Sequence, residues 1–409
     1  MPRTRRPPRR RSAHPPPKGI FTLEALQARH GDSLILHYGP ATSPRFLVID
    51  GGPAGVYKSS LRPRLDAVKE AWHPDGALPL QMVMVSHIDD DHIDGILDLT
   101  AGLVERRTDR RPLPYDILTL WHNSFDDILG SANDAAFARL AAAVRPVAGG
   151  GALPAGLPLS LPGALLVASV GQGRALRDHA VQLGLPVNSP FEGLVAAPGA
   201  GARTLAFGSG LSLTVLGPRQ DRIAALQTEW DRQVKKKGLS ADEAQTLAAA
   251  FTDRSVFNLS SIVVLAEAGG RRMLLTGDAR GDDILAGLRS AGLLRGGTLH
   301  VDLLKLPHHG SDRNVATDFF RQITADRYVV SGNGEFGNPE VATLKMISEA
   351  RGKADFTLYL TNRDGKNNLG RRLNDFFAAE KSRGRKYQVL FRKEAALSVL
   401  VDLLEPVRY

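Results

Sequence analysis

The chain has 409 residues, of which 43% are apolar and 23% are charged, and its formal net charge is +9. These values are ordinary for a globular protein, and the length suits one large domain with insertions or two domains. Because the chain has no cysteine, disulfides, thiolate zinc sites and cysteine nucleophiles are excluded. No apolar run reaches the roughly 18 residues of a membrane span, and the basic start lacks the apolar segment of a secretory signal. We therefore expect a cytoplasmic protein without a membrane partner.

Residues 1–18 are rich in arginine and proline, with seven cations and no acidic side chain. They can bury almost no apolar surface, so we expect a disordered basic tail. Such a tail is either an arm for nucleic acid or another acidic partner, or a solvated extension, and composition alone favours the extension. We predict that residues 19–409 form a single domain with insertions at about 106–201 and 219–256.

The elements expected from residue 19 onward alternate between strands and helices, which indicates a layered α/β fold. Short apolar or alternating runs predict strands at 19–26, 33–38, 45–49, 80–85, 116–120, 211–216, 260–267, 272–276, 301–306, 327–331, 356–361, 387–391 and 396–403. Amphipathic or alanine-rich runs predict helices at 61–72, 93–100, 132–147, 174–183, 222–236, 241–251, 282–291, 339–350 and 369–381. The stretch 157–170 carries prolines, and we expect it to be loop and strand.

The segment Ser86 to Gly95, with the sequence S-H-I-D-D-D-H-I-D-G, directly follows the strand predicted at 80–85. It presents two histidines and alternate aspartates within six residues, at His87, Asp89, Asp91 and His92. Imidazole and carboxylate groups bind divalent metals at neutral pH, and this mixture suits zinc or manganese. The alternative is a polar loop whose acidic run stabilises the start of a helix. That alternative leaves both histidines without a role, so the segment predicts a metal site.

Metal-type side chains also follow other predicted strands, at Asp50, Asp278, His308 and His309. Repeated clusters of this kind are hard to attribute to chance, and they predict a site at a shared edge of two sheets that face one another. His122 follows the strand predicted at 116–120. It is either an additional ligand or a partly buried structural histidine.

With these clusters the chain resembles the metallo-β-lactamase-fold hydrolases over nearly all of residues 20–403. The matching pieces are S-H-I-D-D-D-H-I-D-G (86–95), N-L-S-S-I-V-V-L (258–265), L-L-T-G-D-A (274–279) and L-K-L-P-H-H-G-S (304–311). The resemblance is greatest to the phosphodiesterase-like branch that includes the soluble domain of bacterial DNA-uptake channel (ComEC-type) proteins. It implies a four-layer αββα sandwich with helical insertions and two divalent metal ions, Zn²⁺ or Mn²⁺, at one edge of the sheets.

The resemblance also implies a role for each candidate residue. The ligands of the first ion would include His87 and Asp89, and those of the second would be Asp91, His92 and His309. Asp278 would bridge both ions, and Asp50 would support the site from behind its ligands. His308 would face the substrate phosphate or exchange roles with His309.

Two of these residues would take part in catalysis. Asp91 would orient the attacking hydroxide while it binds its ion, and His308 would stabilise the phosphoryl oxygens. Lys305 is a second candidate for that stabilisation, or else an ordinary strand residue. Asp89 stands where the family commonly has histidine, which is typical of the DNA-uptake-like branch and favours a manganese-tolerant site. The Asn-Pro pair at 338–339 replaces a frequent His-Pro, which puts in doubt any proton-donor role there.

We therefore expect a metal-dependent hydrolase that cleaves phosphodiester bonds in a nucleic acid, such as DNA or RNA, or in a smaller nucleotide. The ions would generate hydroxide near neutral pH by lowering the pKa of a bound water. One alternative is a hydrolase of thioesters, lactones or lactams on the same metals. Another is a module that keeps the fold for binding alone.

Overall fold

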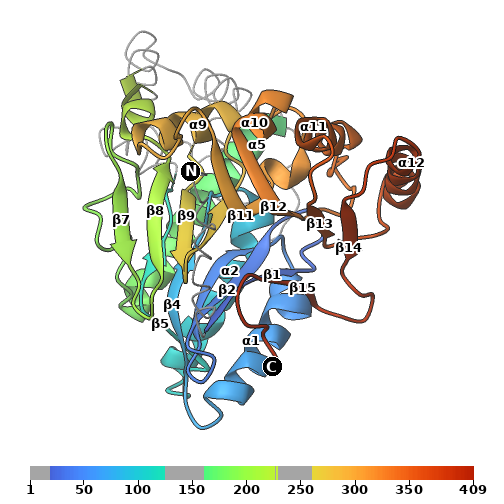
Figure 1. The fold of residues 1–409 in the computed structure, drawn as a ribbon. Helices are drawn as coiled ribbons and strands as arrows, with labels where there is room; N and C mark the ends of the chain where they lie inside the picture. The colour runs from blue at the N-terminus through green and yellow to red at the C-terminus, as the bar shows by residue number, and fades with distance from the viewer. Residues whose placement is uncertain (1–18, 125–160, 226, 229–259) are drawn as a thin grey trace, which may run out of the picture.

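The computed structural model describes residues 19–124, 161–225, 227–228 and 260–409, and Figure 1 shows their arrangement. The strands of the first sheet are β1 (Ile20–Leu26), β2 (Ser33–Gly39), β3 (Arg45–Gly51), β4 (Leu78–Met84), β5 (Tyr115–Ile117), β6 (Leu120–Trp121) and β15 (Ser398–Asp402). Their order is β15-β1-β2-β3-β4-β5, and β6 continues beyond β5 along the same side of β4. This sheet is antiparallel from β15 to β3 and parallel from β3 onward.

The strands of the second sheet are β7 (Arg203–Ala206), β8 (Ser212–Gly217), β9 (Val263–Ala268), β10 (Arg271–Leu275), β11 (Leu299–Lys305), β12 (Ile323–Val330), β13 (Thr357–Leu360) and β14 (Gln388–Phe391). They follow one another across the sheet from β7 at the left of Figure 1 to β14 at the right. The strands from β10 to β14 are parallel, and β7 to β10 are antiparallel.

Helices cover the outer faces of both sheets. Those beside the first sheet are α1 (Arg62–Trp72), α2 (Asp90–Thr108) and α5 (Leu161–Leu183). Those beside the second are α9 (Gly281–Ser290), α10 (Thr317–Gln322), α11 (Val341–Arg351) and α12 (Leu369–Ser382). A π-helical turn, η1 (Tyr57–Leu61), leads into α1, and a short 3-10 turn, η3 (Pro307–Gly310), follows β11.

Three hydrophobic clusters separate the layers. Successive side chains of a strand point to opposite faces of its sheet, and β3 shows the consequence. Val48 packs in the cluster that contains residues of α1 and α2, whereas Leu47 packs in the cluster shared with the second sheet. In β10, Met273 belongs to that shared cluster and Leu274 to the one beneath α9 to α12. The predicted four-layer αββα sandwich is confirmed.

The topology places the ends of several strands at one edge of the sandwich. β3, β4 and β6 are parallel neighbours in the first sheet, and β10, β11 and β12 are parallel neighbours in the second. Carboxyl ends of parallel strands meet at the same edge of a sheet, where ligands commonly bind. The segments that follow β4, β10 and β11 carry the metal-type residues found in the sequence.

Local structure differs from expectation in several places, and neither β7 nor α10 was expected. The prediction of loop and strand at 157–170 is wrong from Leu161 onward, because α5 begins there; its proline lies in the first turn, where no helical hydrogen bond is lost. The strand expected at 116–120 is divided into β5 and β6. Helix α2 begins at Asp90, three residues earlier than expected.

Parts of the prediction lie outside the described residues. These are the tail at 1–18, the helix at 132–147 and most of the helical insertion at 222–251. Among the described residues, no helix is both long and apolar enough to cross a membrane.

Candidate metal centre

Asp278 lies at the middle of the candidate site, at the end of β10, and is buried. Its Oδ1 is 3.3 Å from His92 Nε2 and 3.5 Å from His309 Nε2. Its Oδ2 is 3.5 Å from His308 Nε2 and 3.8 Å from His87 Nε2. Each carboxylate oxygen therefore faces its own pair of histidines.

The set around Oδ1 also contains Asp91. His309 Nε2 is 3.2 Å from His92 Nε2 and 3.3 Å from Asp91 Oδ2, and His92 Nε2 is 3.9 Å from Asp91 Oδ1. Two ligands about 2.0–2.1 Å from one tetrahedral ion lie about 3.3–3.4 Å apart. The spacings within this set therefore fit the shell of a single ion, and we refer to it as the inner set.

The set around Oδ2, which we call the outer set, contains His87, Asp89 and His308. His87 Nε2 is 3.5 Å from Asp89 Oδ2, and it is a fully buried nitrogen with no hydrogen-bond partner. Buried polar atoms are nearly always satisfied, so this nitrogen is suited to a cation beside it. The side chains of Asp89 and His308 are 36% and 31% exposed, so the outer set opens toward solvent.

Asp89 bears on the choice between metal binding and stabilisation of the helix start, although Asp90 and Asp91 do lie in the first turn of α2. It occupies the position that precedes α2, but its side chain makes no capping hydrogen bond. A capping aspartate would accept a hydrogen bond from the first turn of the helix. Here the carboxylate turns toward His87 instead, as a ligand would.

The electrostatics of the inner set require positive charge. Burial by itself would raise the pKa of Asp278, but the surrounding histidines hold that pKa well below its ordinary value. Burial would lower the pKa of His92 and His309, yet the adjoining carboxylates raise both pKa values well above the ordinary value. The pKa of Asp91 falls to about 2 because His92 and His309 outweigh its burial. Protons on the histidines or divalent cations would each balance these carboxylates, and binding of the cations would release the protons.

Asp50 positions His92. His92 Nδ1 and Asp50 Oδ2 are 2.8 Å apart, and the Ser86 backbone N–H donates to Asp50 Oδ1 at 2.6 Å. A carboxylate on Nδ1 leaves the Nε2 lone pair for a metal, as is usual for metal-binding histidines. Asp50 adopts a φ of 58°, and a side chain at the following Gly51 would collide with the backbone of α2. Of the two glycines noticed in the sequence, Gly51 allows this close approach, whereas Gly52 has a φ of 74° and faces Val56.

Asp32 does the same for His309, and sequence reasoning missed it. Asp32 lies just before β2 and is buried. Its Oδ2 is 3.7 Å from His309 Nδ1, and Ser331 connects the two by donating to Asp32 while lying 3.1 Å from His309 Nδ1. The only signal in the sequence was an aspartate after a glycine at the start of a strand.

Lys305 is unavailable for the stabilisation of substrate oxygens, which corrects that interpretation. It is 1% exposed, and its Nζ donates to Asp32 Oδ2 at 2.7 Å and to the Leu306 carbonyl at 3.1 Å. The second interpretation, an ordinary strand residue, is the one that the structure supports. The positive charge of the Lys305 ammonium group offsets the negative charge of the buried Asp32 carboxylate.

His122 follows β6 at the same edge of the first sheet and is buried. Its backbone N–H donates to Asn188 Oδ1 at 2.9 Å, and its carbonyl accepts from Asn188 Nδ2 at 2.8 Å. Within the described residues, two groups have ligand atoms that all lie within 4.8 Å of one another: Asp32, His92, Asp278 and His309, and His87, Asp91 and His92. Neither group contains Asp89, His308 or His122, and the role of His122 as a ligand stays a prediction.

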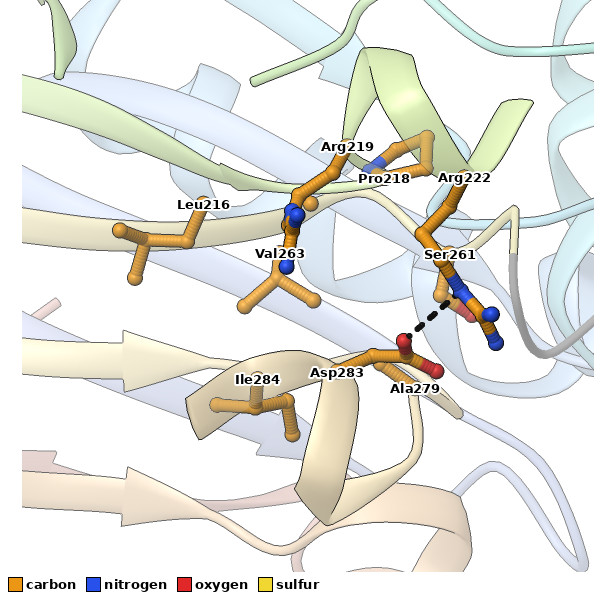
Figure 2. A pocket seen from close by; sticks show the side chains of 10 residues that line it. Leu216, Pro218, Arg219, Arg222, Ser261, Val263, Ala279, Asp283 and Ile284 are labelled. Carbon is orange, nitrogen blue, oxygen red and sulfur yellow. Dashed lines mark ion pairs between the residues drawn. The ribbon is translucent and has the colours of Figure 1, made fainter. Parts of the chain in front are cut away.

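A small cavity adjoins the centre on the side of α9. Figure 2 shows Arg222 and Asp283 at its edge, joined by an ion pair of 3.3 Å. Ser261, which also lines the cavity, accepts a hydrogen bond from the Asp278 backbone N–H at 3.3 Å. The cavity has about 10 Å³, room for about one water molecule. It is too small to hold a substrate.

Comparisons with known proteins add little beyond the fold. No protein-family model matches the chain, and no curated protein matches it. Among solved structures the chain is similar to the metallo-beta-lactamase fold protein YhfI from Bacillus subtilis, with a TM-score of 0.37 and 11% sequence identity. The match covers 94% of this chain and 100% of that chain. At this distance the likeness carries no argument about chemistry, which rests on the side chains of the centre.

Proposed function

We propose that the protein is a metal-dependent phosphodiesterase with a two-ion centre, related to the ComEC-type branch of the metallo-β-lactamase-fold hydrolases. The observation that carries this proposal is buried Asp278, whose two oxygens face two adjoining sets of His and Asp side chains at 3.3–3.8 Å. The inner set and Asp278 would hold one ion, and the outer set and Asp278 would hold the other. Two divalent ions, Zn²⁺ or Mn²⁺, supply a nucleophilic hydroxide near neutral pH and neutralise charge on a phosphoryl group.

The residues of the chain determine where a substrate would lie. His87 and Asp278 are almost fully buried, whereas Asp89 and His308 are partly exposed. A phosphodiester would therefore approach across the outer set. Asp91, 22% exposed, lies between this opening and the inner histidines and would orient the nucleophile.

His308 would hold a proton at a defined atom. Its Nδ1 lies 2.8 Å from Asn314 Oδ1, and Asn314 Nδ2 donates to the Asp278 carbonyl at 3.1 Å. With the amide oriented in this way, Nδ1 carries a hydrogen and Nε2 faces Asp278 Oδ2. Two lone pairs repel at 3.5 Å unless a proton or a cation lies between them. His308 is therefore either the proton donor to the leaving oxygen or a ligand of the outer ion.

Carboxylates favour a phosphodiester over a thioester, lactone or lactam. Asp89, Asp91 and Asp278 all belong to the two sets, and their negative charge weakens the Lewis acidity of each ion. Polarising a single carbonyl needs that acidity, whereas a phosphoryl group is clamped by two ions at once. A module that only binds would have no use for a buried, unpartnered nitrogen such as His87 Nε2.

The test is a substrate panel with metal-depleted protein to which Mn²⁺ or Zn²⁺ is returned. We expect hydrolysis of bis-p-nitrophenyl phosphate and of short DNA or RNA, and no hydrolysis of a thioester or β-lactam. Cleavage of the thioester or β-lactam without diester activity would overturn the proposal. The variant His308→Ala separates the two roles of that residue. A roughly 10²-fold lower turnover with both metals retained identifies a general acid, and loss of one metal identifies a ligand.

A further inference from the structure

A fixed aromatic side chain lies at the rim of the centre. Phe336 is 72% exposed, on the loop that joins β12 to α11. A single exposed apolar residue is common and needs no explanation. Phe336 differs because its loop is anchored on both sides and begins and ends at residues that contact the metal-type histidines.

The loop is held by hydrogen bonds to the backbone on each side of Phe336. Asn367 Nδ2 donates to the Glu335 carbonyl at 2.9 Å, and Arg372 donates to the Gly337 carbonyl at 3.0 Å. The Gly334 N–H donates to the Asn338 carbonyl at 2.8 Å, which closes the loop on itself. The ring is therefore presented from a defined backbone position.

The ring is also oriented from its side. His30 packs edge-on against it, with ring centroids 4.9 Å apart and planes at 84°. His30 Nδ1 lies 3.0 Å from Glu335 Oε2, which fixes the imidazole. The edge-to-face geometry is the one that aromatic pairs prefer. Most of the Phe336 ring nevertheless remains in water.

The loop that carries Phe336 and the turn that carries His30 both contact residues of the centre. Ser331, just before the loop, contacts His309, and Asn338, at its end, donates to the His308 carbonyl at 3.3 Å. On the other side, a side chain at Gly31, next to His30, would lie 2.0 Å from the Asp91 carbonyl oxygen. The turn that carries His30 is thus packed directly on the segment that carries Asp91.

We propose that Phe336, held by His30, is a stacking platform for a nucleobase of the substrate. This inference rests on the proposed phosphodiesterase function and extends it to substrates that contain a nucleotide. We place the base of a bound nucleotide over this ring because its loop ends at Asn338, beside His308; aromatic rings stack on any base without reading its sequence. The expected specificity is for nucleotide diesters of any base.

The test compares two substrates that differ only in the base. They are thymidine 5′-(p-nitrophenyl phosphate) and its abasic analogue, in which hydrogen replaces the thymine. We expect kcat/KM for the thymidine substrate to be higher by about 5- to 150-fold, the range of one base–aromatic stack. The variant Phe336→Ala is expected to lose this preference and to keep the rate on the abasic substrate. Phe336→Trp is expected to retain the preference.

The matched control is Leu390→Ala, which removes another exposed apolar side chain, on strand β14; its preference is expected to be unchanged. A preference that survives in Phe336→Ala, or an equal loss on both substrates, would overturn the stacking role. If neither diester is cleaved, the proposed function fails, and the stacking role of Phe336 is then tested by measuring nucleotide affinity. Calorimetry with thymidine 5′-monophosphate and the abasic phosphate is then expected to show the same base-dependent difference, abolished in Phe336→Ala. Equal affinities would refute it.

Discussion

Asp32 gives the sharpest test of how the centre is built. It faces Lys305 at 2.7 Å and reaches His309 both through Ser331 and across 3.7 Å. Asp32 and Lys305 are both about 1% exposed. Burial would raise the pKa of Asp32, but Lys305 and His309 hold it well below the ordinary value. Asp32 is therefore a buried anion that pairs with the Lys305 ammonium group on one side and positions His309 on the other.

The substitution Asp32→Asn separates these two roles. Losing the partner of a metal-binding histidine costs about 10- to 100-fold in metal affinity. Leaving Lys305 buried without its partner costs about 3–5 kcal/mol of the free energy of unfolding. Adding Lys305→Met removes the unpaired charge, since replacing a buried ion pair by apolar groups is often neutral or better. We expect the double variant to regain most of the stability and none of the metal affinity.

The assay pairs urea unfolding in the presence of chelator with a metal titration against a competing fluorescent chelator. Unfolding without metal matters, because bound metal stabilises the folded state by mass action. Wild-type metal affinity in Asp32→Asn would refute the positioning role. A double variant as unstable as the single variant would refute the role of the unpaired lysine.

Three further outcomes are expected. The pKa of Glu24 is lowered from 4.5 to about 2, because its partners His37 and Arg64 outweigh its burial. The stabilisation that Glu24 contributes is complete above pH 4.5 and is lost as the pH falls toward 2. The free energies of unfolding of wild type and Glu24→Gln are therefore expected to converge by about 3 kcal/mol over this range. A difference that does not change with pH would contradict this. His122→Ala is expected to weaken one of two metal-binding steps if His122 is a ligand, and calorimetric titrations identical to wild type would assign it to the structure alone. Deleting residues 2–18 is expected to reduce the salt dependence of DNA or RNA binding without changing turnover of a small diester, and equal salt slopes would make the tail a bystander.

Much of the fold and of the site could be predicted because the signals are local. Val83 to Gly95 combines an apolar strand with a run of ligand-type residues, and Asp278 follows a strand in the same way. Asp50 was recognisable because two glycines follow it, and the first of them, Gly51, lies against the backbone of α2. Such features require only the period of a strand and the properties of glycine.

The parts that were missed depend on contacts between distant segments. Asp32 lies in an ordinary turn, and its importance comes from Lys305, 273 positions away. Lys305 was considered for the substrate side because its strand leads to the histidines, but strand alternation alone does not say which face is buried. The division of β5 from β6 reflects pairing with two separate parts of β4, which the local sequence does not specify.

The central claim is that Asp278 joins two metal ions in one buried centre. The direct measurement is elemental analysis of purified protein that has been loaded with Mn²⁺ or Zn²⁺ and then freed of loosely bound ions. We expect about two ions per chain in the wild type and in the control Asp318→Ala, whose exposed side chain pairs with Arg321. Asp278→Ala is expected to retain fewer than one ion while its circular dichroism spectrum stays native. A wild-type protein without bound metal, or an Asp278→Ala variant that keeps both ions, would contradict the claim.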